Sequence, residues 1–219
     1  MDVTKIGVIG AGQMGNGIAH VMALAGYQVC LNDISKDVLS QAITRIDKNM
    51  TRQVKSGKIA DADKAAALSR ITTTLSIADI GQSDLVIEAA TEDEPTKQVI
   101  FDALVPHIQD HTILTSNTSS ISITRLASRT GRPEKFMGFH FMNPVPVMQL
   151  VELIRGIATD KETYDTCRTV VENLGKTPAS ANDNSIVLFH PLLQSMSSFV
   201  ASSRFEHDML IIDCLYLNE

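Results

Sequence analysis

The sequence is poor in cysteine. Its 219 residues include three cysteines, which are Cys30, Cys167 and Cys214. An odd number at wide and unrelated spacings argues against a disulfide framework and against a zinc site. A chain of this length can bury a full hydrophobic core without such cross-links. We therefore expect the three thiols to behave as small, buried apolar residues.

Long apolar runs and an excess of positive charge are missing as well. No apolar run approaches the ~20 residues that a membrane-spanning helix needs, and the residues after Met1 lack the pattern of a secretory signal. We therefore expect a cytoplasmic protein that does not associate with a membrane. The formal net charge of −6 disfavours nucleic acid as a partner, so an anionic ligand would need a local basic patch.

What the chain does have, close to its N-terminus, is a glycine-rich turn between a predicted strand and a predicted helix. The β-branched run Lys5-Ile-Gly-Val-Ile9 is followed at once by Gly10-Ala-Gly-Gln-Met-Gly15, and apolar residues then recur at helical spacing up to Gly26. This order is typical of a dinucleotide-binding turn, in which the glycines permit a tight turn, approach of a pyrophosphate and close packing of helix on strand. The residues predicted to form the site here are Gly10, Gly12, Gln13, Met14 and Gly15.

An acidic residue closes the next predicted strand. Residues 28–32 form a second strand-like run, and Asp33 follows it, close to the spacing of about 20 residues that is usual after the glycine turn. A carboxylate there accepts hydrogen bonds from the hydroxyls of the adenosine ribose and repels a 2′-phosphate. The sequence therefore favours NAD(H) over NADP(H), although Lys36 lies close enough to soften the repulsion.

Predicted strands and helices alternate through the chain. Strands are expected at 71–75, 85–89 and 112–116, and a helix is expected at 95–108. Such alternation predicts an α/β fold with a Rossmann-type, doubly wound and mostly parallel sheet. Ligands of these sheets bind at the carboxyl ends of the strands, which is where Asp33, Glu92, Asn117 and Ser119 fall.

Two helix starts follow from local patterns. Near 122–128 a short helix is expected, and either Ser119 or Ser120 could cap it or could instead contact a substrate. Thr159 and Glu162 have the spacing of a capping box. They predict a helix that ends at Gly175 and leads to a closing strand at 177–181.

The stretch 138–152 places one imidazole and one carboxylate at the ends of two short apolar runs that a proline-rich turn joins. If the turn at 143–146 brings the runs together, Glu152 can accept the proton on one ring nitrogen of His140. The other ring nitrogen is then a fixed proton acceptor, which suits a reaction that removes a proton from a substrate hydroxyl. The alternative is a structural histidine beside an edge carboxylate.

A basic patch lies on the helix that Ser35 is expected to begin and that runs to about residue 54. Most such charges form a solvated helix face. The alternative is contact with the phosphates of a large anionic substrate, and charge alone does not decide between the two. The basic residues concerned are Arg45, Lys48, Arg52, Lys55 and Lys58.

Three motifs together resemble the NAD-binding domain of the 3-hydroxyacyl-CoA dehydrogenase family. They are the glycine turn, Asn117-Thr-Ser-Ser120, and the run from His140 to Glu152, and the run at 150–159 strengthens the match. The resemblance implies an NAD-dependent oxidoreductase that interconverts short-chain 3-hydroxyacyl-CoA and 3-oxoacyl-CoA.

The resemblance also implies roles for single residues. It makes His140 the catalytic base, Glu152 its orienting partner, and Ser119 a hydrogen-bond donor to the reacting oxygen. Because the basic helix faces CoA in the family, it raises the expectation that Arg52 and Lys55 bind the acyl-CoA substrate. The residues that it implies for the NAD site are Asp33, Glu92, Lys97, Asn117 and Asn143.

The resemblance covers Met1 to Asp183 and then stops. We expect an NAD-binding domain at 1–183 and a divergent apolar tail at 184–219, with the family's helical domain missing. That domain would supply a dimer interface, one wall of the cleft and a catalytic Asn, whose position falls at His190. Two hypotheses follow, an active oxidoreductase or a dinucleotide-binding domain with little or no turnover and some tendency to self-associate.

Overall fold

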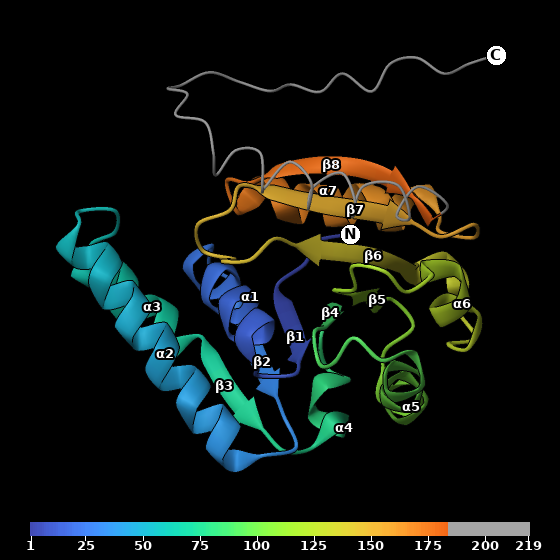
Figure 1. The fold of residues 1–219 in the computed structure, drawn as a ribbon, viewed down its shortest axis with the longest axis horizontal. Coiled ribbons are helices and arrows are strands. Elements are labelled where there is room, and N and C mark those ends of the chain that lie inside the picture. The colour runs from blue at the N-terminus through green and yellow to red at the C-terminus, as the bar shows by residue number, and fades with distance from the viewer. Residues whose placement is uncertain (184–219) are drawn as a thin grey trace, which may run out of the picture. The chain divides into compact units, whose positions relative to one another are not determined.

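An eight-stranded sheet with helices on both faces organises residues 1–183, the part of the chain that the computed structural model describes (Figure 1). The strand order is β3-β2-β1-β4-β5-β6-β7-β8. Within this part, neighbouring strands are parallel except β6 and β7, which are antiparallel. The predicted Rossmann-type, doubly wound and mostly parallel sheet is confirmed. The predictions for the tail at 184–219, for His190 and for Cys214 lie outside the described residues.

The elements follow the predicted alternation closely. The strands are β1 (Lys5–Ile9), β2 (Gln28–Asn32), β3 (Ile71–Thr74), β4 (Leu85–Glu88), β5 (Ile113–Ser116), β6 (Phe136–Phe141), β7 (Leu150–Arg155) and β8 (Thr177–Asn182). The helices are α1 (Gln13–Leu24), α2 (Lys36–Lys55), α3 (Asp61–Ser69), α4 (Ile77–Ile80), α5 (Glu94–Leu104), α6 (Ile123–Ser128) and α7 (Lys161–Asn173), with 3₁₀ turns at Val105–His107 and Pro133–Lys135.

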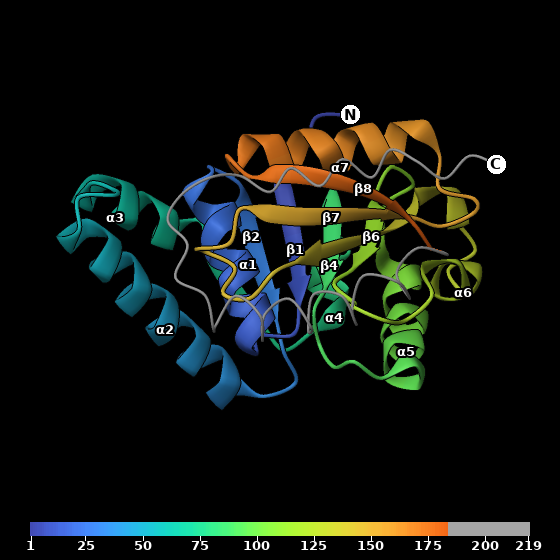
Figure 2. The same ribbon diagram turned by 45° about the horizontal axis from the view of Figure 1, so that its top comes forward.

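Two hydrophobic clusters hold the helices on the two faces of the sheet. Successive residues of a strand point to opposite faces, so Val8 of β1 joins the cluster under α1, α2 and α7, whereas Ile9 joins the cluster under α4, α5 and α6. Full burial of one such aliphatic side chain contributes about 1.5 to 3 kcal/mol. The same alternation recurs in β4, where Ile87 joins the first cluster and Val86 the second. At the far end of the sheet, α7 packs against β7 and β8 (Figure 2).

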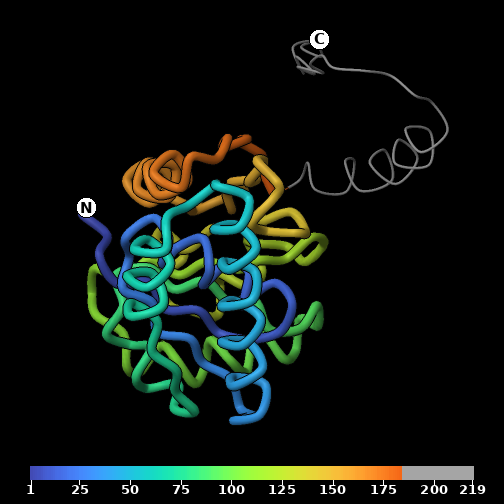
Figure 3. The backbone as a smooth tube through the Cα atoms, turned by 90° about the vertical axis from the view of Figure 1, so that its left-hand side faces the viewer, coloured from blue at the N-terminus to red at the C-terminus, as the bar shows by residue number. Residues whose placement is uncertain are grey.

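The long helix α2 has a shorter partner. Figure 3 shows α2 and α3 side by side, and Lys64 of α3 forms an ion pair with Asp47 of α2 at 2.8 Å. As predicted, the Ser35 hydroxyl accepts a hydrogen bond from the amide of Val38 and caps α2. None of the helices in residues 1–183 is long and apolar enough to cross a membrane.

Two glycines in the turn between β1 and α1 are required by the geometry of that turn. Gly10 has φ +94°, a conformation that favours glycine, and its amide donates to the carbonyl of Asn32 at 2.8 Å. A Cβ on Gly15 would lie 1.7 Å from the carbonyl oxygen of Gly10. The predicted tight turn at Gly10 and close packing at Gly15 are therefore confirmed.

The predicted capping box at Thr159 is wrong. Asp160 caps α7 instead, because its carboxylate accepts a hydrogen bond from the amide of Thr163 at 2.7 Å. The Thr159 hydroxyl is buried and committed elsewhere, since it donates to the carbonyl of Phe136 at 2.7 Å and accepts from the amide of Gly156. Because the Thr159 hydroxyl is hydrogen-bonded to β6, it does not cap α7.

The short helix α6 is capped by neither of the two predicted serines. Ser122 is its cap, and the Asp183 carboxylate assists by accepting from the amides of Ile123 and Thr124 at 2.8 and 2.9 Å. The helix predicted at 95–108 also ends earlier, at Leu104, where the chain passes into a 3₁₀ turn.

The cysteines within the described part differ in burial. Cys167 is fully buried in α7, as predicted, and burial raises the pKa of its thiol. Cys30 in β2 is partly buried, and desolvation raises its pKa as well. A raised pKa keeps a thiol protonated and unreactive near neutral pH.

Replacing Gly15 with alanine should destabilise the fold by about 3 kcal/mol or more, the upper end for overpacking, because the new Cβ would overlap the Gly10 carbonyl. Urea denaturation measures the free energy of unfolding. Gly12→Ala is the matched control, since no atom lies within 4 Å of a Cβ there. It should cost less than about 1 kcal/mol, and equal losses for the two variants would contradict this account of the turn.

Candidate active site

A pocket of about 300 Å³ lies at the carboxyl edge of the sheet. Its walls come from the start of α1, from the residues that follow β4, from the ends of β5 and β6, and from the first turns of α5. Parallel strands end at the same edge, so polar residues that follow them are gathered there. The predicted site residues that the structure brings together as its lining are Met14, Glu92, Lys97, Asn117, Ser119, His140 and Asn143.

His140 and Glu152 lie directly opposite each other in the antiparallel pair β6 and β7. The Nδ1 atom of His140 is 2.7 Å from the Oε2 atom of Glu152, and the two side chains are 18 and 20% exposed. The predicted hydrogen bond between them is confirmed. An ionised carboxylate can only accept, so Nδ1 carries the hydrogen, and in the neutral imidazole Nε2 is the proton acceptor. His140 lines the pocket.

Asn117 ties the end of β5 to the strand that carries His140. Its Oδ1 atom accepts a hydrogen bond from the amide of Phe141 at 2.8 Å. Because the oxygen is engaged by the backbone, the amide NH₂ of Asn117 is the group that it can present to a ligand.

Glu92 organises the loop after β5. Its Oε1 atom accepts hydrogen bonds from the Thr118 hydroxyl at 2.6 Å, from the amide and hydroxyl of Ser119 at 2.9 and 3.1 Å, and from the amide and hydroxyl of Ser120 at 3.0 Å. Burial alone would raise the pKa of Glu92, but these donors together with the charge of Lys97 lower it. The Ser119 and Ser120 hydroxyls therefore serve Glu92 rather than the cap of α6.

The glycine turn and Asp33 form the neighbouring part of the site. Asp33 accepts from the amide of Ala11 at 2.9 Å and from that of Ser35 at 3.0 Å, so its carboxylate spans from the end of β2 to the turn. Gln13 donates to Asn143 at 3.1 Å and joins the turn to the loop after β6. Asp33, Gln13 and the turn glycines do not line the 300 Å³ pocket, whereas Met14, which follows Gln13, and Asn143 do.

The turn itself fits a pyrophosphate. No side chain caps the first turn of α1, so its amide groups can donate to an anion, which the helix dipole also favours. A Cβ on Gly12 would meet nothing within 4 Å, which is the open approach that a dinucleotide requires at this position.

One residue that matters for the geometry was missed by the sequence predictions. Glu88, the last residue of β4, is fully buried, and its oxygens lie 2.7 and 2.9 Å from the ammonium of Lys97. Glu88 ends its strand at the same edge of the sheet as Asp33 and Asn117, one residue earlier in register, and this position could have marked it. Lys97 was predicted as a cofactor contact, and its side chain is only 1% exposed.

Arg52 and Lys55 are not part of the pocket lining. Both are exposed on the last turns of α2, where Arg52 makes one long hydrogen bond of 3.4 Å to Asn49.

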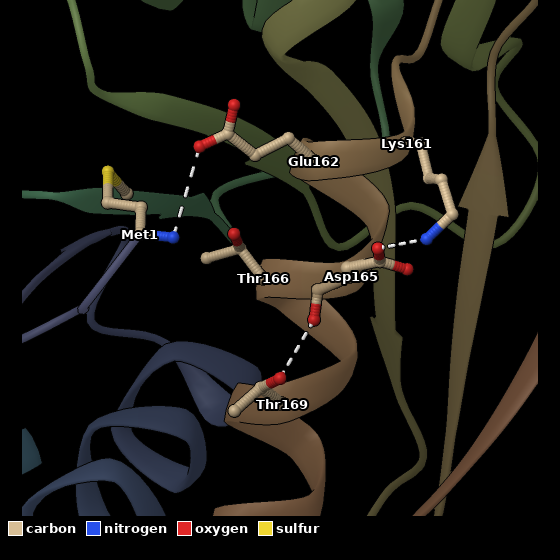
Figure 4. Close-up of a pocket in the computed structure, with 6 residues that line it drawn as sticks. All are labelled: Met1, Lys161, Glu162, Asp165, Thr166 and Thr169. Carbon is tan, nitrogen blue, oxygen red and sulfur yellow. Dashed lines mark hydrogen bonds and ion pairs between the residues drawn. The ribbon is translucent and has the colours of Figure 1, made fainter.

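A second hollow, beside α7, contains none of the predicted site residues. Figure 4 shows its lining, in which the N-terminal ammonium of Met1 lies 3.9 Å from Glu162 and Lys161 is paired with Asp165. Its charges neutralise one another, so it offers no group poised for chemistry.

Comparisons with known proteins agree with this geometry. Residues 5–184 match the family model described as "3-hydroxyacyl-CoA dehydrogenase, NAD binding domain". The chain is 50% identical over 194 residues to a 3-hydroxybutyryl-CoA dehydrogenase of Bradyrhizobium diazoefficiens, a match that covers 89% of this chain and 66% of that protein. A probable 3-hydroxybutyryl-CoA dehydrogenase of Bacillus subtilis is 40% identical over 183 residues, with coverage of 84 and 64%.

A solved structure shows the same fold. The (S)-3-hydroxybutyryl-CoA dehydrogenase of Ralstonia eutropha superposes with a TM-score of 0.85 at 38% identity, covering 92% of this chain and 74% of that one. The chain spans slightly less than two thirds of the length of the curated relatives named here.

Replacing Glu92 with glutamine should make the stability of the protein less dependent on pH in the acidic range. Because the pKa of Glu92 is lowered in the folded protein, the unfolded state binds the proton more tightly, and stability falls as the pH drops from about 4.3 through the lower folded pKa. Thermal unfolding between about pH 5 and pH 3 should show the melting temperature of the wild type falling more steeply than that of Glu92→Gln. Parallel curves would contradict the assignment.

Proposed function

The chain belongs to the 3-hydroxyacyl-CoA dehydrogenase family, and we propose that it binds NAD(H) at the carboxyl edge of its sheet and interconverts a short-chain 3-hydroxyacyl-CoA with the 3-oxoacyl-CoA. The proposed substrate is 3-hydroxybutyryl-CoA, because the three relatives above are named as its dehydrogenases, one of them as a probable one, and acetoacetyl-CoA is the corresponding 3-oxoacyl-CoA. The observation that supports this most is the 2.7 Å contact between His140 and Glu152 at the pocket.

His140 is the proposed catalytic base. With Nδ1 held by Glu152, its Nε2 atom accepts the proton of the substrate hydroxyl, and the carboxylate stabilises the imidazolium that forms. In the reverse direction the imidazolium returns that proton to the 3-oxo oxygen. The cofactor held by the glycine turn and Asp33 would supply the redox chemistry, with NAD⁺ as the hydride acceptor for C3 and NADH as the donor in the reverse direction.

Ser119 is proposed to donate a hydrogen bond to the reacting oxygen. In the ligand-free arrangement its hydroxyl is 3.1 Å from Glu92, so this donor has to change partner when substrate enters. Glu92 keeps several other donors, among them Thr118 and the amides of Ser119 and Ser120. The exchange therefore leaves the Glu92 carboxylate hydrogen-bonded.

The cofactor is proposed to be NAD(H) rather than NADP(H). The amides at the start of α1 and the open approach over Gly12 suit the pyrophosphate, and Asp33 suits the ribose hydroxyls while repelling a 2′-phosphate. The remaining proposed contacts are Gly10, Gln13, Met14, Gly15, Glu92, Lys97, Asn117 and Asn143.

Arg52 and Lys55 are proposed to bind the phosphates of the CoA moiety. They are exposed cations in the last turns of α2, where they can reach a large anion at a smaller cost of desolvation than a buried cation would pay. Residues 1–183 are proposed as the NAD-binding domain, supported by the extent of the family match.

Asp33→Ala should weaken NADH binding by roughly 5-fold to 150-fold, the equivalent of about 1 to 3 kcal/mol for charge-assisted hydrogen bonds. The loss has two sources, since the carboxylate would bind the ribose and also holds the amide of Ala11. Fluorescence titration with NADH measures it. Asp37→Ala, an exposed acid in the first turn of α2, is the control, and an unchanged Kd for Asp33→Ala would remove Asp33 from the cofactor site.

His140→Asn should reduce the rate of NADH oxidation by acetoacetyl-CoA by a factor of roughly 10² to 10⁴ while leaving the Kd for NADH within about twofold. Glu152→Gln should cause a smaller loss, because the amide still accepts from Nδ1 but does not stabilise the imidazolium. The double variant should lose little beyond His140→Asn, since the two residues act as a unit.

The wild-type assay also decides between the two hypotheses. Turnover that disappears in His140→Asn supports the oxidoreductase. Tight NADH binding with no turnover in the wild type would favour a dinucleotide-binding domain, and retained turnover in His140→Asn would refute the role of His140.

A further inference from the structure

A buried carboxylate joins three segments of the pocket wall from behind. The Oε1 atom of Glu88 accepts from the ammonium of Lys97 at 2.9 Å and from the amide of Ala90 at 2.8 Å, and its Oε2 atom accepts from Lys97 at 2.7 Å and from the Ser116 hydroxyl at 2.6 Å. Glu88 and Ser116 are 0% exposed and Lys97 is 1% exposed. Each carboxylate oxygen thus has two donors, and the site is dry.

The partners of Glu88 belong to different elements. Ala90 opens the loop that carries Glu92, Ser116 is the last residue of β5 and directly precedes Asn117, and Lys97 lies in the second turn of α5. The backbone adds a further link, because the amide of Asn117 donates to the carbonyl of Glu88 at 2.7 Å. One side chain therefore fixes the relative positions of the segments that present Glu92, Asn117 and Ser119.

Glu88 also determines what Lys97 can do. An ammonium has three hydrogens, and two of them are directed at the Glu88 oxygens. The Oε2 atom of Glu92 lies 4.0 Å from the same nitrogen, and Lys97 lines the pocket. A flexible lysine is otherwise a mobile point charge, and here its ammonium is held in one place.

We propose that Glu88 is a positioning residue for the nucleotide pocket, which sets the ammonium of Lys97 and the loops at 89–93 and 117–120 in the geometry that NAD(H) requires. This inference rests on the proposed function for its ligand, but the ordering of the two loops is a property of the ligand-free protein. Glu88 does not line the pocket, so it acts through its partners rather than by touching the cofactor.

The competing possibility is that Glu88 and Lys97 form an ion pair that serves only stability. Removing one partner of a buried pair leaves an uncompensated charge and is strongly destabilising, whereas replacing both by apolar residues of similar volume is often tolerated. A variant that removes both charges therefore separates the two roles, because it can fold while the Ser116 hydroxyl and the Ala90 amide lose their acceptor.

The test uses the full chain with the double substitution Glu88→Met and Lys97→Met, and with Ser116→Ala, which keeps both charges and removes a single tie. The matched control is Glu94→Met with Arg125→Met, which removes an exposed ion pair between α5 and α6. The measurements are the melting temperature, amide hydrogen exchange without ligand, and the Kd for NADH by fluorescence titration.

We expect the buried double variant to fold cooperatively, to exchange amide hydrogens faster at 89–93 and 117–120 than the wild type, and to bind NADH at least roughly tenfold more weakly, as the loss of one net hydrogen bond would give. Ser116→Ala should speed exchange at 117–120 only, with a smaller change in Kd that cannot come from loss of Lys97. The control should match the wild type in amide hydrogen exchange at the two loops and in the Kd for NADH.

Unchanged exchange at both loops in a folded double variant would overturn the inference, whatever happens to NADH binding. Equal Kd values for the wild type and Ser116→Ala, together with unchanged exchange at 117–120, would do so as well. If the wild type fails to bind NADH, the proposed function fails, while faster loop exchange in the variants still supports a positioning role for Glu88.

Discussion

The parallel pairing of the strands is the constraint on which the site depends. Because β1, β2, β4 and β5 run in the same direction, their carboxyl ends meet at one edge of the sheet. The loops that follow these strands therefore all begin at that edge. Within residues 1–183, only the neighbouring strands β6 and β7 are antiparallel, and this pairing places Glu152 directly opposite His140. An imidazole, its carboxylate partner and the glycine turn are thus gathered by strand direction alone.

Carboxylates at this edge have different tasks because their surroundings differ. Glu88 is fully buried and paired with Lys97, so it can hold segments together without contacting solvent. Glu92 is 39% exposed and gathers hydroxyl and amide donors around Ser119. Glu152 faces one histidine nitrogen and leaves the other for chemistry. Burial and donor number thus give similar side chains different surroundings, with Glu88 supporting the loops and Glu152 paired with the proposed catalytic base.

The sequence predicted the parts of this arrangement whose causes are local. The turn at Gly10 to Gly15, the strand ending at Asp33 and the cap at Ser35 each follow from a few adjacent residues. The helices α3 and α4 were not predicted, since they are short and their stability comes from packing on α1, α2 and β2. The cap expected at Thr159 failed because its hydroxyl is used by β6, and Glu88 was missed because its partners Lys97 and Ser116 come from later elements. Tertiary contacts of this kind are invisible to local patterns.

Parallel titrations of the chain with NADH and NADPH, followed by the fluorescence of the bound nicotinamide, test the central claim most directly. If the glycine turn and Asp33 form a site for an unphosphorylated adenosine ribose, NADH should bind and NADPH should bind at least roughly tenfold more weakly, since the carboxylate would face a 2′-phosphate. The absence of binding by either nucleotide, or equal binding of both, would contradict the assignment of this edge of the sheet as an NAD(H) site.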